Sequence, residues 1–223
     1  MRLFAYKGYL IGLLASVLFL GFFALADFQH LRTPGHNNTG HETLVCIECH
    51  EESKGSIRQQ IQANLSYLIG TRPDVVTFNF STPDNYDCLA CHDRDNDNHP
   101  IYRFNEPRFL EARKAIQPQL CQSCHIEHSG VRVTSSPENC ELCHQELNVK
   151  DDPLETTHLE LIKDEQWDSC LRCHDFHGNH DMKTPSQTNK MLELQSIEAY
   201  FNGGADPYSA KKLNKAKETR YEN

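Results

Sequence analysis

The chain is short of apolar residues, of basic residues and of methionine. Its hydrophobic fraction is 38%, and part of that lies in one N-terminal run, so the rest looks too polar to bury a large core unaided. The formal net charge is −9, whereas a protein that binds nucleic acid usually carries a basic surface patch. The charge therefore argues against nucleic acid as a partner. These shortages predict a fold that takes apolar volume from something other than its own side chains.

No cysteine lies outside one repeated motif, Cys-X-X-Cys-His. The motifs, numbered here as boxes 1 to 5, are 46–50, 88–92, 121–125, 140–144 and 170–174. This spacing is typical of c-type haem attachment, because two thiols three positions apart can each form a thioether to one vinyl group of the same haem. The adjacent histidine then becomes the proximal ligand of the iron. The sequence therefore predicts five covalently bound haem c groups.

Both residue sets follow directly from the boxes. The predicted thioether residues are Cys46, Cys49, Cys88, Cys91, Cys121, Cys124, Cys140, Cys143, Cys170 and Cys173. The predicted proximal ligands are His50, His92, His125, His144 and His174. A disulfide framework would give no reason for a histidine after every second cysteine. Zinc sites need two halves of a tetrahedron, which five equivalent units do not supply.

The remaining histidines are candidates for the distal position on each iron. The chain has 13 histidines, enough for every haem to be held by two. The candidates are His41, His99, His128, His158, His177, His180 and His36, with His30 the weakest. His128 follows His125 too closely to bind the same iron, so it is expected to reach a neighbouring haem, and His41 could do likewise. Met182 is the one methionine considered as an alternative.

The predicted fold is mainly α with much irregular coil and little or no sheet: a haem-cored multihaem cytochrome c. Short helices are expected around each box. An amphipathic helix is predicted over 56–69, with an apolar stripe expected to pack on a haem face. Another is predicted over 187–201, stopped by 202–204. Because Cys121 and Cys140 are only 19 residues apart, the haems of boxes 3 and 4 are expected to be near neighbours.

The N-terminus predicts a compartment. Arg2 and Lys7 precede an uncharged apolar run over 9–26, which favours an uncleaved single-span anchor in the inner membrane with the haem domain in the periplasm. The small-residue pattern at 24–26 also fits a signal peptide. The predicted organisation is a membrane anchor or uncleaved signal sequence over 1–26, a pentahaem domain over 27–183, and a C-terminal helix with a basic tail over 184–223. The tail is expected to be solvated or disordered, with docking to an acidic partner as the alternative.

One stretch carries a resemblance to a known family. Over 121–144 the chain reads Cys-Gln-Ser-Cys-His-Ile-Glu-His-Ser-Gly, followed by box 4. Together with 28–46, it resembles the multihaem cytochromes c related to class III tetrahaem cytochromes, particularly those with doubled boxes. The resemblance implies closely packed bis-histidine haems that serve electron transfer. It also implies distal roles for His41 and His128.

The function expected from these features is electron transfer and not catalysis. The expected partners are other redox proteins, such as cytochromes and reductases. The alternative is a quinol-oxidising electron-entry subunit of a respiratory reductase, which would use membrane quinol. Its layout resembles the anchored tetra- and pentahaem quinol dehydrogenases. A nitrite reductase is disfavoured, because the chain contains no Cys-X-X-Cys-Lys motif.

Overall fold

A computed structural model describes residues 2–24 and 33–221, without the side chains of 2–5 and 23–24. Its α-helices are α1 (Arg2–Ala24), α2 (Cys46–Cys49), α3 (Ile57–Leu68), α4 (Asn85–His92), α5 (Leu110–Ile116), α6 (Glu141–His144), α7 (His158–Lys163), α8 (Asp168–Cys173) and α9 (Leu194–Phe201). Short 3-10 turns are η2 (Ile101–Asn105), η3 (Pro107–Phe109), η4 (Cys121–Ser123), η5 (Pro137–Cys140) and η6 (Thr188–Lys190). In these residues β-pairing is limited to two isolated bridges, so the mainly helical prediction is confirmed.

The N-terminal helix corrects the predicted localisation. In the described part of the chain, no helix is both long and apolar enough to cross a membrane. This contradicts the predicted localisation, a single-span anchor in the inner membrane with the haem domain in the periplasm. Most of the predicted cleavage site at 24–26, and His30, lie outside the described residues.

Each box forms one helical turn. Box 1 spans α2 and its C-cap, box 2 ends α4, box 3 begins with η4, box 4 runs from η5 into α6, and box 5 ends α8. The histidine amide closes the turn onto the first cysteine in box 1 (2.8 Å), box 3 (3.0 Å) and box 5 (2.8 Å). Positions i, i+3 and i+4 of a helical turn share one face. The two thiols and the imidazole of a box can therefore contact the same ligand.

The helices between the boxes begin at sequence-encoded caps. Ser56 and Gln59 form a reciprocal capping box at the start of α3. Asp84 with Asp87 does the same for α4, and Thr157 with Glu160 for α7. Asn202 and the left-handed Gly203 end α9, as predicted.

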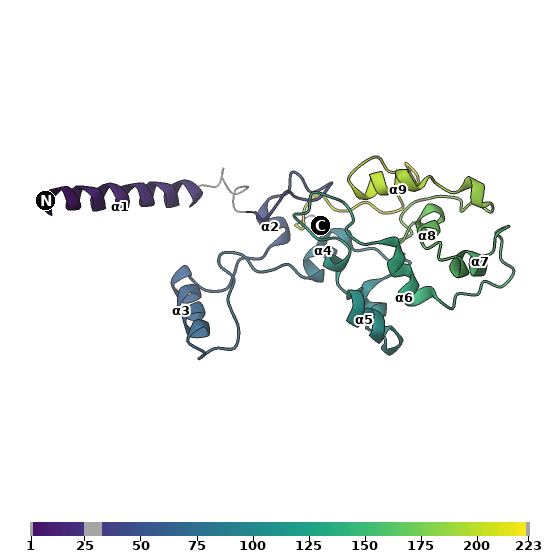
Figure 1. The fold of residues 1–223 in the computed structure, drawn as a ribbon, viewed down its shortest axis with the longest axis horizontal. Helices are drawn as coiled ribbons and strands as arrows, with labels where there is room; N and C mark the ends of the chain where they lie inside the picture. Colours follow the sequence, from purple (N-terminus) through teal and green to yellow (C-terminus); the bar gives the residue numbers. More distant parts are fainter. Residues whose placement is uncertain (1, 25–32, 222–223) are drawn as a thin grey trace.

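The apolar core made by the protein is small. Leu154, Leu161, Cys173 and Met191 form one buried cluster beside α7 and α8. Figure 1 shows α2 and α4–α9 gathered together, with α3 set to one side on a long hairpin. Few apolar side chains are buried elsewhere in the described residues, while many large ones stay exposed.

The C-terminal tail runs back over the body as an ordered segment, and most of its side chains over 211–221 are exposed, in keeping with a solvated tail. The Leu213 amide bonds to the Asn179 carbonyl (2.7 Å), and the Lys217 amide to the Cys91 carbonyl (3.1 Å). Further along, Arg220 pairs with Asp87 at 3.0 Å. The C-terminus accordingly lies near α4 in the middle of the molecule (Figure 1).

Candidate haem-binding site

The structure brings the histidines together in twos, each pair joining one box histidine to one histidine from elsewhere. We number the pairs by their box. They are pair 1, His50 with His128 (ring centroids 6.3 Å apart); pair 2, His92 with His41 (5.8 Å); pair 3, His125 with His177 (6.2 Å); pair 4, His144 with His99 (6.2 Å); and pair 5, His174 with His158 (6.3 Å). Every box histidine is paired, and no histidine is used twice.

This spacing fits one metal ion between two imidazoles. Bonds from imidazole nitrogen to a metal ion are about 2.0–2.1 Å, and each ring centre lies roughly 1 Å behind its nitrogen, so two rings that face one metal ion have centres about 6.0–6.2 Å apart. Rings in direct stacking contact would lie closer, as His99 and Phe176 do at 4.2 Å. Four of the five pairs are at 6.2–6.3 Å. The residues present therefore fit an axially ligated haem at each pair.

The free thiols and the neutral charge of four box histidines are also compatible with haem binding. All ten cysteines are free of disulfides. Burial lowers the pKa of His92 to about 4, and burial also lowers the pKa of His125, His144 and His174. A low pKa keeps these rings neutral, the form in which imidazole binds a metal. Within the described residues, no group of three or more His, Cys, Asp or Glu side chains could by itself hold a metal ion.

Most paired rings are oriented through Nδ1, which leaves the other nitrogen to face the partner ring. His50, His99 and His125 bond through Nδ1 to the backbone carbonyls of Ser81 (2.8 Å), Phe176 (2.6 Å) and Arg132 (2.8 Å). His41, His158 and His177 bond instead to the carboxylates of Glu127 (2.6 Å), Asp152 (2.9 Å) and Asp97 (3.1 Å). Such bonds fix the tautomer and the direction of a ligating ring.

Pair 1 depends on a tightly built loop. His128 lies in the left-handed region (φ +61°), and its buried Nδ1 has no hydrogen-bond partner in the described part of the chain. The side chain of Asn38, only 3% exposed, holds this loop. Its Oδ1 accepts from the amides of Ser129 and Gly130 (both 3.1 Å) and from the Ser129 hydroxyl (2.9 Å). A Cβ on Gly35 would collide with the His128 carbonyl oxygen, so that position requires glycine.

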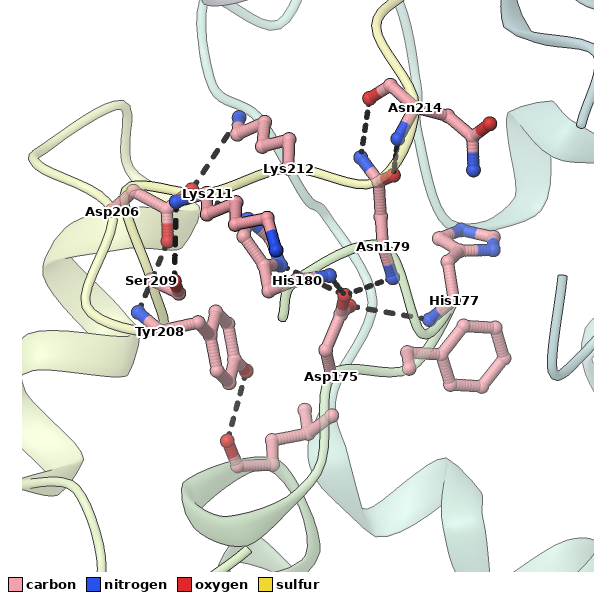
Figure 2. Close-up of polar contacts among 12 residues, drawn as sticks. Asp175, His177, Asn179, His180, Asp206, Tyr208, Ser209, Lys211, Lys212 and Asn214 are labelled. Carbon is pink, nitrogen blue, oxygen red and sulfur yellow. Dashed lines mark hydrogen bonds and ion pairs between the residues drawn. The ribbon is translucent and has the colours of Figure 1, made fainter. Parts of the chain in front are cut away.

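His180 was a predicted distal candidate, but the structure places it in a different setting. Its side chain is 4% exposed, with Nδ1 at 2.8 Å from Asp175 and Nε2 at 2.7 Å from Asp206. Tyr208 stacks on its ring (Figure 2). Both ring nitrogens are therefore engaged by carboxylates, and His180 fastens the C-terminal tail to box 5. His36 also remains outside the five pairs.

The pairs are linked to one another through the chain. Of the distal rings, His41 lies just before box 1 and serves pair 2, whereas His128 lies just after box 3 and serves pair 1. His177 follows box 5 and serves pair 3. His99 lies between boxes 2 and 3 and serves pair 4, and His158 lies between boxes 4 and 5 and serves pair 5. In none of the five pairs is the second histidine the non-box histidine that lies closest in sequence to that box.

Neighbouring boxes also touch. Helix α4 of box 2 contacts η4 of box 3, and the interaction between the thiols of Cys88 and Cys121 raises the pKa of Cys88 and lowers that of Cys121 to about 7. The same interaction joins Cys140 of box 4 to Cys170 of box 5. Phe176 bridges pairs 3 and 4, because it stacks on His99 at 4.2 Å and meets His177 edge-on at 5.0 Å. Boxes 2 to 5 thus form a contiguous series.

Several positioning residues were missed by the sequence reasoning. They are Asn38, Asp97, Glu127 and Asp152, and each contacts a candidate ligand or its loop. The only sequence signal was local: Glu127 lies directly before His128, and Asp97 lies two residues before His99. Comparisons with known protein families, curated proteins and solved structures find no match to this chain.

Proposed function

We propose that this chain is a pentahaem c-type cytochrome that transfers electrons through five bis-histidine haems. The observation that carries the proposal is the set of five histidine pairs, each with one box histidine and a spacing suited to a metal ion between the rings. Chance proximity would not pair each box histidine once with a different partner. Haem, when bound, supplies a one-electron ferric/ferrous couple.

The protein's part is to hold, orient and connect the five groups. The box thiols would attach each haem covalently, and the two rings of a pair would both ligate its iron, so that no coordination position would be left for a substrate. This favours an electron-transfer protein over an enzyme. The contacts between boxes 2 and 3, 3 and 4, and 4 and 5 support a series of neighbouring groups, which electron transfer across the protein requires. The resemblance to the class III-related multihaem cytochromes supports the same conclusion.

The partners proposed are other redox proteins. With a formal net charge of −9, the surface is suited to docking against a basic patch on a cytochrome or reductase. Such docking should weaken as ionic strength rises.

The test is haem stoichiometry together with low-temperature electron paramagnetic resonance of the oxidised holoprotein. Five haems per chain with only low-spin ferric signals are expected. Fewer than five covalent haems, or a substantial high-spin signal from the unaltered protein, would overturn the proposal, because an open axial position would then be available for chemistry.

A further inference from the structure

The five pairs fall into two groups according to what their rings bond. In pairs 2, 3 and 5 the distal ring donates through Nδ1 to a carboxylate, from Glu127, Asp97 and Asp152 respectively. In pair 1, His50 bonds to a backbone carbonyl, and the Nδ1 of His128 has no partner among the described residues. In pair 4, His99 bonds to a backbone carbonyl. Neither ring of pairs 1 and 4 has a carboxylate partner in the described part of the chain.

A carboxylate acts on the metal through the ring. When a ligating imidazole donates its outer N–H to an anion, the ring becomes a stronger electron donor, and the more positive oxidation state of the metal is favoured. A neutral carbonyl does this more weakly, because charge-assisted hydrogen bonds are roughly twice as strong as neutral ones. The haem behind a carboxylate-bonded ring should therefore have the lower reduction potential.

The three carboxylates are not equivalent. Glu127 makes the shortest bond, at 2.6 Å, although its side chain is 35% exposed. Asp152 is 10% exposed, and its oxygen is shared with the His158 amide at 2.7 Å. Asp97 lies 3.7 Å from the Arg94 guanidinium, which offsets part of its charge. The effect should be larger for Glu127 and Asp152 than for Asp97.

We propose that Glu127, Asp152 and Asp97 are positioning residues that lower the potentials of the haems at pairs 2, 5 and 3, leaving those at pairs 1 and 4 as the higher-potential sites. This rests on the proposed function, since it takes a bis-histidine haem at each pair. The first reducing equivalents that enter the protein are then held at pairs 1 and 4. The haems at pairs 1 and 4 would therefore retain electrons, and the haems at pairs 2, 3 and 5 would pass them on.

The experiment compares Glu127→Gln, Asp152→Asn and Asp97→Asn with Glu42→Gln in the holoprotein. Each replacement amide keeps an oxygen that can accept from the ring and removes only the charge. Glu42 lies next to His41 but bonds to the Gly40 amide at 2.9 Å and not to the ring, so it controls for loss of one charge in the same segment. The readout is a potentiometric titration followed by visible absorption and by electron paramagnetic resonance of samples poised along it.

Glu127→Gln should raise one potential so that the ferrous-to-ferric ratio of that haem increases about tenfold at a fixed potential, or about 59 mV for a one-electron couple. Asp152→Asn should act similarly, and Asp97→Asn should give a smaller rise. Asp152 also caps its own turn through the Leu154 amide, so if that variant does not fold, the other two still decide.

Failure of the inference is distinguishable from failure of the proposed function. If the unaltered protein carries five low-spin haems but the carboxylate variants titrate like Glu42→Gln, the tuning role is overturned while the bis-histidine assignment stands. If the unaltered protein lacks five six-coordinate haems, the proposed function fails first.

Discussion

Two regions of this molecule are built on opposite principles. The paired body, 33–50 together with 83–214, contains all ten cysteines and every paired histidine, and it buries few apolar side chains of its own. The α3 hairpin, 54–80, contains neither residue type. It is held by side-chain amides: Gln60 bonds to the Gly55 carbonyl at 3.0 Å, and Asn64 bonds to the Val76 carbonyl at 2.7 Å. The paired body is therefore held together by ring pairs between residues far apart in sequence, whereas the α3 hairpin is held by local hydrogen bonds.

The largest effect should come from removing one paired ring. His177→Ala takes away the distal side of pair 3, so one of the five haems should become high-spin. Electron paramagnetic resonance detects the change, and His36→Ala is the matched control because His36 lies outside the pairs. A variant that stayed entirely low-spin would contradict the pairing. Hydrogen exchange in the α3 hairpin should stay as in the unaltered protein.

The next largest effect is expected at Asn38. Asn38→Ala removes four hydrogen bonds to the loop that carries His128, including one to the Ile126 carbonyl at 2.9 Å. At about 1 kcal/mol for each bond, the body should lose about 3–4 kcal/mol of stability. Thermal unfolding followed by haem absorbance measures the loss, and the exposed Asn148→Ala is the control. Equal melting temperatures in the two variants would show that the loop is held by other means.

A smaller and strictly local effect is expected at Gln60. Gln60→Leu removes a buried amide that bonds to three backbone groups across the hairpin. Opening of 54–80 should become easier by about 1–3 kcal/mol, as measured by native-state hydrogen exchange. The low-spin haem signals should not change. Any change in them would break the separation between the two regions.

The smallest effect is expected at the cap of α3. Ser56→Ala removes the acceptor for the Gln59 amide and should cost about 1 kcal/mol, confined to exchange within the helix. Ser56→Asp keeps an acceptor and should restore the protection. Loss of protection in α4 or α8 as well would mean that the hairpin and the body are coupled.

Sequence patterns predicted what is local. The short helices around the boxes, the helix predicted over 56–69 and the stop at 202–204 all depend on neighbouring residues, and the structure confirms these elements, with α3 at Ile57–Leu68. The predicted helix over 187–201 is confirmed only from Leu194 onward. The segment before it is extended at Met191, because Met191 is buried against α7 and α8 and the Arg172 guanidinium bonds to the Leu192 carbonyl at 2.7 Å. Tertiary packing overrides local propensity there.

The spacing of the boxes along the chain could not predict all the contacts between boxes. The 19-residue separation of Cys121 and Cys140 favoured boxes 3 and 4 as neighbours, and Phe176 does link pairs 3 and 4, but it did not predict the contacts between boxes 2 and 3 and between boxes 4 and 5. The Asn85 side chain explains the first contact, because it bonds to both the Gln119 carbonyl (2.7 Å) and the Cys121 amide (2.9 Å). The predicted packing of the α3 stripe on a haem face stays a prediction. Its residues are 53–79% exposed in the polypeptide, as seen at Ile61 and Leu68.

Because each box histidine pairs with a histidine from another part of the chain, the order of synthesis also determines the order in which the pairs can form. With haem bound as proposed, pair 2 can close as soon as His92 has been synthesised, since His41 precedes it. Pair 1 has to wait for His128, although its box comes first. Pairs 4 and 5 close with their own boxes, and pair 3 closes last, at His177, three residues beyond the end of box 5. A nascent chain that ends between His174 and His177 would therefore lack only the second ring of pair 3, and the five pairs would be complete once His177 has been synthesised.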